Sequence, residues 1–190
     1  MVSREREEEI KSSEAMNVIR KAEAADIERI EAAYDEHFEY EREHEAFTVF
    51  RKGVYPTRET AVNALNAGTL YVYEDEGGVQ GSVIIDGRQA EEYKNIEWGK
   101  KLDAGKVKVV HLLMVRPSAA KRGIASALMR FAEELARDHS CEALRLDTGA
   151  QNIPAVSLYK KLGYRVVASA DMKVGGAVAH PGHLFLEKLL

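Results

Sequence analysis

Hydrophobic and polar positions along this chain follow two different periods, and the period changes several times between residues 16 and 190. Apolar residues three and four positions apart mark one face of a helix, whereas alternation or a short apolar run marks a strand. The helical spacing begins after Asp26, a residue type that favours helix N-termini. The core-facing positions of this predicted helix are Ile27, Ile30, Tyr34 and Phe38.

Further helices and strands follow from the same patterns. Thr57 is predicted to cap a second helix, whose buried face includes Val62 and Leu65 and which ends at Gly68. The inner positions of a third helix, over 123–139, are Ile124, Leu128, Phe131 and Leu135. The remaining predicted elements are a helix over 154–162 and strands over 16–20, 70–74, 79–85, 107–115, 143–147, 165–168 and 184–188.

Two connections between these elements are distinctive. Residues 75–78, Asp-Glu-Gly-Gly, suit a tight hairpin turn because glycine tolerates positive φ. Residues 87–106 are polar and irregular and include Tyr93 and Trp98, and long loops of this kind often bind ligands. The periods alone predict a mixed α/β fold with no linker or internal repeat. We therefore expect a polar arm over 1–15 and one domain over 16–190.

Composition argues against several classes of protein. The chain has 190 residues with 27 basic and 31 acidic side chains, and its net charge of −4 gives a nucleic-acid partner no overall electrostatic support. No apolar run approaches the length of a membrane span, so no membrane partner is expected. Cys141 is the single cysteine and cannot form an internal disulfide, and residues 4–9 are charged where a signal peptide needs apolar residues. A cytoplasmic protein is expected.

One pair of segments carries most of the functional information. Residues 152–164 read N-x-x-A-x-x-L-Y-x-K-x-G-Y, and they follow a glycine-containing turn, residues 121–125, that enters a helix. The pair resembles the GNAT superfamily, the acyl-CoA-dependent N-acyltransferases. The resemblance covers residues 16–190 and is strongest over 107–164. It implies the GNAT fold, a mostly antiparallel mixed sheet of about seven strands with helices on both faces and a splayed central parallel pair.

A coenzyme A site can be argued at the turn before the third helix. The first N–H groups of a helix lack internal partners and, with the helix dipole, form an anion site that suits a pyrophosphate. Gly123 lets the backbone approach without a Cβ, and Lys121 and Arg122 either add positive charge or are ordinary solvated side chains. Ala120 and Lys121 depart from the family's Q/R-x-x-G-x-G/A pattern. The expected contacts are Lys121, Arg122, Gly123, Ile124 and Ala125.

The resemblance implies further contacts with acetyl-CoA. The main chain of Leu113, Met114 and Val115 is expected to bind the pantetheine arm and the thioester oxygen, where a backbone N–H stabilises the developing oxyanion. Tyr159 is the expected acid that protonates the leaving sulfur, the alternative being a half-buried packing aromatic. Asn152 is expected to cap its helix, to contact pantetheine, or to do both.

The base that deprotonates the amine has more than one candidate. His111 is expected to share a face of its strand with Leu113 and Val115, and similar family members that acetylate arylalkylamines place a histidine there. An imidazole gains and loses protons near neutral pH, although a histidine satisfied by core hydrogen bonds is equally compatible. Asp147 is a weaker candidate that would otherwise cap a loop. Ordered water without a dedicated base is the third option.

The acceptor is the least determined part of the prediction. Between Glu23 and Glu45 lie ten acidic residues and two basic ones, Arg29 and Arg42, which would attract a cationic amine or simply form a solvated helical face. An apolar pocket for the acceptor could be lined by Tyr34, Phe38, Tyr93 and Trp98.

We therefore predict an N-acetyltransferase that transfers an acetyl group from acetyl-CoA to a primary amine of a small molecule or protein, without a metal. The alternative is a catalytically silent acyl-CoA-binding sensor or assembly module with the same fold, which the altered turn motif permits. A nucleotide-binding phosphate loop is set aside because its G-x-x-x-x-G-K-[ST] pattern does not occur. The choice between acetyl and longer acyl donors stays open, and a homodimer is one option for assembly.

Overall fold

A computed structural model describes residues 17–190, so the predicted arm over 1–15 and Met16 lie outside the described residues. The α-helices are α2 (Ile27–Glu43), α3 (Arg58–Asn66), α4 (Ile124–Asp138) and α5 (Ile153–Lys161). The strands are β1 (Val18–Lys21), β2 (Leu70–Asp75), β3 (Gly78–Asp86), β4 (Val107–Val115), β5 (Ala143–Gly149), β6 (Arg165–Val174) and β7 (Val178–Leu189). Short 3-10 helices are η1 (Ala24–Asp26), η2 (Glu91–Asn95), η3 (Ala104–Lys106) and η4 (Pro117–Ala119).

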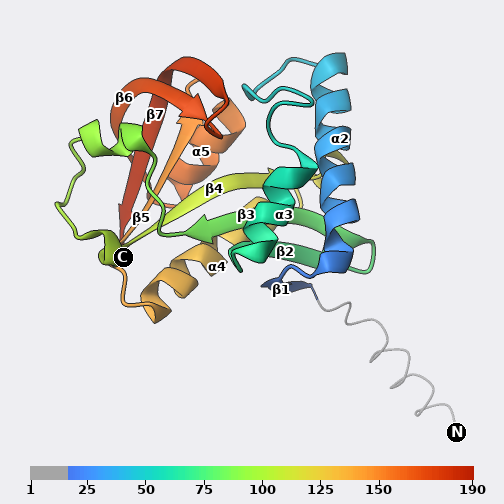
Figure 1. Ribbon diagram of the computed structural model, residues 1–190, viewed down its shortest axis with the longest axis horizontal. Coiled ribbons are helices and arrows are strands. Elements are labelled where there is room, and N and C mark those ends of the chain that lie inside the picture. Colours follow the sequence, from blue (N-terminus) through green and yellow to red (C-terminus); the bar gives the residue numbers. More distant parts are fainter. Residues whose placement is uncertain (1–16) are drawn as a thin grey trace, which may run out of the picture.

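The strands form one mixed sheet in the order β1-β2-β3-β4-β5-β7-β6 (Figure 1). Each neighbouring pair is antiparallel except β4 and β5, which run parallel. The ladder of this parallel pair ends at Val109 and Arg145, and the two strands diverge beyond those residues. The order of elements and the splayed parallel pair confirm the predicted α/β class and the GNAT fold.

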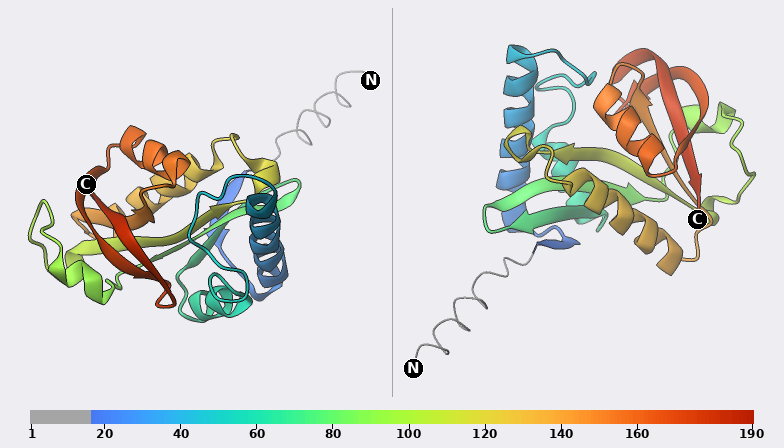
Figure 2. Two further views of the ribbon diagram at one scale, coloured as in Figure 1. Left: turned by 90° about the horizontal axis from the view of Figure 1, so that it is seen from above. Right: turned by 180° about the vertical axis from the view of Figure 1, so that it is seen from behind.

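Helices cover both faces of the sheet, and each buries an apolar stripe against it. Figure 2 shows α2 and α3 on one face and α4 and α5 on the other. Ile30 of α2 and Leu128 of α4 are fully buried in the two resulting cores. Truncating a side chain as enclosed as Leu128 to alanine typically costs about 2–5 kcal/mol, so these stripes hold the helices in place.

Two details of the fold differ from the sequence prediction. The strands predicted over 165–168 and 184–188 are parts of the longer β6 and β7, which form a hairpin. Register shifts in this hairpin interrupt the alternation of apolar positions, so the pattern reveals only one end of it. In α3 the fully buried positions are Ala61 and Ala64, and the predicted Val62 and Leu65 are only partly buried because the small side chains face the sheet.

Residues 87–106 cover the outer half of the sheet on the α2 and α3 side. Tyr93 is 2% exposed and packs edge-on against Phe185 of β7, with ring centroids 5.3 Å apart. The guanidinium of Arg145 lies 4.2 Å from the ring centre of Trp98, and it forms a buried ion pair with Glu187 at 3.0 Å. This segment is therefore a cover over a buried charge pair.

Candidate active site

The parallel pair β4 and β5 opens into a gap in the middle of the sheet. On the β3 side, Met114 and Val115 pair with Ser82 and Gly81. On the β5 side, the ladder covers only the beginning of β4, so the main chain around Leu113 faces the opening. Because buried backbone groups require hydrogen-bond partners, this edge is suited to bind an extended ligand such as a pantetheine arm.

A β-bulge in β4 controls which side chains face this opening. Leu112 has φ of 44°, and the register with β3 shifts there, so that His111 pairs with Ile84 and Met114 with Ser82. Three steps along β4 thus match two steps along β3. One extra residue in a strand reverses the faces of the residues that follow it.

The prediction that His111 shares a face with Leu113 and Val115 is wrong because of this bulge. Leu113 and Val115 pack against the core beneath α4, whereas His111 lies with Ile84 at a cavity beneath α3. A two-residue period cannot be continued across a bulge.

The predicted coenzyme turn has the backbone geometry of an anion site. Gly123 precedes the first residue of α4 with φ of 81°, and Lys121 also lies in the left-handed region with φ of 65°. A Cβ added at Gly123 would meet no atom within 4 Å, so its α-carbon faces open space. The turn therefore presents the N–H groups of the α4 N-terminus to the outside, as an anion site requires.

Arg122 in this turn already has a partner. Its Nη2 atom lies 2.5 Å from Oδ2 of Asp75, at the end of β2. The other carboxylate oxygen of Asp75 accepts hydrogen bonds from the Gln80 side chain and the Gly77 backbone, each at 2.8 Å. The β2–β3 turn thus orients Arg122, an arrangement that the sequence did not reveal because Asp75 and Arg122 are far apart in the chain.

The predicted acid, Tyr159, lies on α5 and is 7% exposed. Burial raises the pKa of its hydroxyl well above the usual value, and the charge of Asp147 raises it further, so the phenol stays protonated at neutral pH. Its ring packs edge-on against the ring of Tyr164, and the two ring centroids lie 6.0 Å apart. Asn152 caps α5, because its Oδ1 atom accepts a hydrogen bond from the Ala155 backbone at 3.3 Å.

His111 belongs to a polar triad that the sequence did not reveal. Its Nε2 atom lies 3.0 Å from Oδ1 of Asp86, and Oδ2 of the same carboxylate accepts a hydrogen bond from Nε of Arg88 at 2.7 Å. Burial raises the pKa of Asp86, but the hydrogen bonds and charge of His111, together with Arg88, outweigh it and hold that pKa at about 2. An ionised Asp86 favours the tautomer with the proton on Nε2, which leaves Nδ1 of His111 free to accept one.

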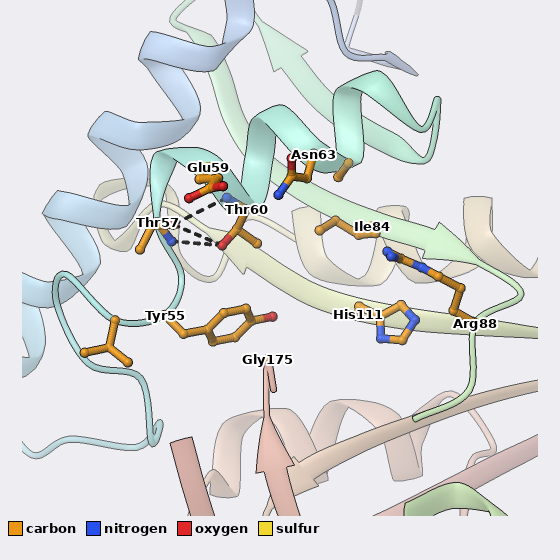
Figure 3. Close-up of a pocket in the computed structure, with 11 residues that line it drawn as sticks. Tyr55, Thr57, Glu59, Thr60, Asn63, Ile84, Arg88, His111 and Gly175 are labelled. Carbon is orange, nitrogen blue, oxygen red and sulfur yellow. Dashed lines mark hydrogen bonds between the residues drawn. The ribbon is translucent and has the colours of Figure 1, made fainter. Parts of the chain in front are cut away.

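A cavity of about 420 Å³ lies beside His111 on the α3 side of the opening (Figure 3). The hydroxyl of Tyr55 points toward His111, and the ring of Tyr55 packs on Gly175 at the tip of the β6–β7 hairpin. The walls thus come from α3, from three connecting segments and from the strands β3 and β4. The lining residues are Val54, Tyr55, Thr57, Glu59, Thr60, Asn63, Ala64, Ile84, Arg88, His111 and Gly175.

The aromatic residues proposed for an acceptor pocket do not line this cavity. Tyr34 is buried between α2 and the sheet, with Phe38 packed partly against the same core. Tyr93 and Trp98 belong to the cover over β5 and β7. Tyr93 nevertheless reaches the opening, because its hydroxyl donates a hydrogen bond of 2.8 Å to Oδ1 of Asp147.

Many acidic side chains of the first helical region are bound to local partners. Asp26 pairs with Arg20 at 2.7 Å and Glu31 with Arg58 at 2.6 Å. Glu41 accepts hydrogen bonds from the backbone and side chain of Thr48. These contacts favour a structural role for much of the negative charge over attraction of a cationic acceptor.

Comparison with known proteins identifies the family. The model of the Acetyltransferase (GNAT) family matches residues 21–164, which include the coenzyme turn and the tyrosine motif. The chain therefore belongs to the GNAT acetyltransferase family. Among curated proteins, none gives a significant match.

Solved structures share the fold at low sequence identity. A GNAT-family acetyltransferase from Streptococcus agalactiae has a TM-score of 0.74 and 19% identity, with 91% of this chain and 95% of that chain covered. The yncA protein from Salmonella typhimurium, solved with its cofactor acetyl-CoA, has a TM-score of 0.63 and 19% identity over 91% and 93% of the two chains. A ribosomal-protein-alanine N-acetyltransferase from Brucella melitensis has a TM-score of 0.63 and 20% identity over 91% and 99%.

Two further observations concern residues 17–190. Histidine, cysteine and acidic side chains in this range do not gather in groups of three or more that could hold a metal ion. Among the helices of the same range, none has the length and apolar character that crossing a membrane requires.

Proposed function

We propose that this protein transfers an acetyl group from acetyl-CoA to a primary amine of a small molecule or protein, by direct attack in a ternary complex. The observation that carries the proposal is the buried hydroxyl of Tyr159, which lies on α5 within the tyrosine motif and whose raised pKa keeps it protonated at neutral pH. GNAT proteins use acetyl-CoA, and the similar yncA structure contains it. The opening between β4 and β5 offers the extended backbone that such a coenzyme needs.

The donor would bind on the α4 side of the opening. Its pyrophosphate lies at residues 121–125, where backbone N–H groups and Arg122 supply positive charge. Its pantetheine arm pairs with the main chain of Leu113 to Val115, and a backbone N–H there stabilises the oxyanion of the thioester carbonyl. These contacts are supported by the open edge of β4 and by the open space at Gly123.

The acetyl transfer then requires two proton movements. The neutral amine attacks the thioester carbon, so a C–N bond forms while the C–S bond breaks. Tyr159 donates its hydroxyl proton to the leaving sulfur, which avoids expulsion of a free thiolate. The nitrogen loses a proton, and Nδ1 of His111 accepts it because Asp86 holds the other ring nitrogen in its protonated form. Return of this proton through solvent to the phenolate of Tyr159 completes the cycle with no net change in protons.

The acceptor would enter from the cavity beneath α3. Polar side chains there, including Thr60 and Asn63, could orient an amine toward His111. The structurally similar protein from Brucella melitensis is called a ribosomal-protein-alanine N-acetyltransferase. Protein acceptors therefore belong in the acceptor panel. The cavity volume of about 420 Å³ also admits small amines.

The proposal is tested with an acceptor panel. Purified protein is incubated with acetyl-CoA and amines, amino acids and peptides, and free thiol release is measured. Turnover that depends on both acetyl-CoA and one class of amine is the expected result, and parallel reactions with longer acyl-CoA donors identify the preferred acyl chain. Tight acetyl-CoA binding without turnover across the panel would instead support the silent binding module.

A further inference from the structure

One charged side chain of the acceptor cavity has no direct part in the acetyl transfer described above. Arg88 follows β3 and lines the cavity together with His111 and Thr60. Its side chain is 76% exposed, whereas the side chain of His111 is 26% exposed. Arg88 therefore lies closer to solvent than the imidazole does, at the mouth of the cavity.

The guanidinium of Arg88 is held on one side by Asp86. Its Nε atom donates a hydrogen bond to Oδ2 of that carboxylate at 2.7 Å, and the Arg88 backbone N–H donates to Oδ1 at 2.8 Å. Within residues 17–190, these are the hydrogen bonds that Arg88 makes, and neither uses an Nη atom. A guanidinium fixed through Nε presents the edge formed by its two Nη atoms, which matches the two oxygens of a carboxylate.

Figure 3 shows where the charges of the cavity lie. Arg88 extends from the segment after β3 toward Ile84, at the end of the cavity that also holds His111. Glu59 is the acidic residue of the lining and lies at the opposite end. The end next to His111 is therefore the one that suits an anion.

Asp86 places this anion-binding edge close to the proposed base. Its Oδ1 atom lies 3.0 Å from Nε2 of His111, and its Oδ2 atom lies 2.7 Å from Nε of Arg88. A single carboxylate group thus separates the two side chains. An acceptor whose amine reaches His111 and whose anion reaches Arg88 can carry both groups in one small molecule, and a cavity of about 420 Å³ holds a molecule of that size.

The charge of this group of side chains changes during the proposed reaction. While His111 is neutral, the negative charge of Asp86 balances the positive charge of Arg88. When His111 accepts the proton of the amine, the three side chains together carry a net positive charge. An anion bound at Arg88 compensates that charge in a partly buried site, where uncompensated charge is costly.

We propose that Arg88 binds a carboxylate of the acceptor, so that the amine acetylated by this protein belongs to a small amino acid or a related amino-carboxylic acid. The inference rests on the proposed function and names the acceptor class within it. The amine enters the cavity toward His111, and the carboxylate stays at the mouth, where the Nη edge of Arg88 holds it with two parallel hydrogen bonds. No covalent bond forms or breaks at Arg88.

Matched acceptors test this carboxylate subsite. Free thiol release from acetyl-CoA is measured with α-, β- and γ-amino acids and with the carboxamide of each, which keeps the amine and the length but loses the negative charge. Arg88→Gln should lower the ratio of kcat/KM for acid over amide by about tenfold or more, because a bidentate, charged pair of hydrogen bonds is lost. Differences in acidity between the two amines cancel when this ratio is compared between wild type and variant.

Two further variants serve as controls. Arg88→Lys keeps the positive charge without the planar fork and should retain part of the preference for the acid. Arg58→Gln makes the same change at an exposed arginine of α3 that pairs with Glu31 and lies outside the cavity lining. This variant should keep the wild-type ratio, and acetyl-CoA affinity should be equal in all of these proteins.

The possible outcomes separate the subsite from the proposed function. Equal losses for acid and amide in Arg88→Gln would mean that Arg88 acts only through Asp86, and they would overturn the subsite. Turnover confined to amines without a carboxylate, or preference for peptides over the amino acids at their N-termini, would overturn it as well. Each of these results leaves the proposed acetyl transfer standing. Absence of wild-type turnover on every acid and amine would instead reject the proposed function, and the subsite with it.

Discussion

The two sides of the opening between β4 and β5 are built in different ways. On the α4 side, the groups assigned to the coenzyme are mostly backbone, and they come from one continuous part of the chain, residues 107–164. On the α3 side, the cavity is lined by residues from separate segments, including Tyr55, Thr60, His111 and Gly175. The coenzyme side thus depends on local backbone geometry, and the acceptor side depends on tertiary packing.

This difference explains why the donor is easier to infer than the acceptor. A helix N-terminus and a free strand edge bind a phosphate and an amide-containing arm through groups that every residue has. A cavity lined by side chains changes its preference with each substitution. The predictions below separate the two sides, starting with the largest expected effect.

Tyr159→Phe should give the largest loss, because the proposed acid would act at the point where donor and acceptor meet. The change removes only the hydroxyl, so the ring still packs against Tyr164 and acetyl-CoA affinity should stay within about twofold. Loss of a general acid should lower kcat by a factor of about 10² to 10⁴. Steady-state kinetics with calorimetric binding measures both quantities, and a variant as active as wild type would show that Tyr159 is not the acid.

His111→Ala changes the acceptor side and should lower kcat/KM by about tenfold to a hundredfold, because the proposed base is lost. The variant should also lack the acidic limb of the pH profile of kcat/KM, with acetyl-CoA binding unchanged. Asp86→Asn should have a smaller effect in the same direction, because it no longer orients the imidazole. If both variants lose thermal stability but keep the wild-type pH profile, His111 is a core residue and has no part in proton transfer.

Gly123→Val changes the coenzyme side and should weaken acetyl-CoA binding by about tenfold or more. Valine disfavours the φ of 81° found at this position, and its side chain adds atoms where the pyrophosphate would lie. Gly176→Val is the matched control, because Gly176 has φ of 71°, also lacks neighbours within 4 Å, and lies in the β6–β7 turn. Isothermal calorimetry of both folded variants is the measurement. Unchanged affinity in Gly123→Val would reject the placement of the pyrophosphate.

A smaller effect is expected at Arg122. Arg122→Gln should weaken acetyl-CoA binding by about threefold to tenfold at low ionic strength, and the loss should shrink as salt is added. Asp75→Asn removes the competing negative partner of Arg122 and should leave affinity equal or higher. Equal losses in the two variants would mean that the ion pair supports the turn and that Arg122 does not bind phosphate.

The smallest expected effect is a change in the free energy of unfolding at acidic pH, caused by Asp86. The pKa of Asp86 is about 2 in the folded protein, below the value of 3.8 for a free side chain, so its ionised form stabilises the fold above about pH 4. That contribution should disappear as the pH falls from about 4 to 2. The difference in unfolding free energy between wild type and Asp86→Asn, measured by urea titration, should therefore narrow over this range; a difference independent of pH would contradict it.

The sequence predicted the order of elements because each helix and strand has its own apolar period. The helix after Asp26 and the strand 107–115 agree with α2 and β4. Predictions became incomplete where the period is interrupted or where small residues face the core. The β6–β7 hairpin is longer than predicted for the first reason, and the buried face of α3 differs for the second.

Candidate residues divide in the same way. Tyr159 and the turn at Gly123 could be found as candidates because their motif spacings are local in the sequence. Asp86 and Tyr55 could not be found, since neither has a signal in its own neighbourhood and each gains its role from a contact across the sheet or between loops.

The sequence by itself therefore determined the family and pointed to a candidate acid, because both depend on short-range spacing that is readable without coordinates. Only the tertiary structure decided the acceptor side. A single bulge at Leu112 placed His111 and the residues after it on opposite faces of β4, and packing brought Asp86 within hydrogen-bond distance of His111. The physical reason is that a strand's period, a buried charge and a cavity wall are set by neighbours distant in the chain, and local patterns do not encode those neighbours.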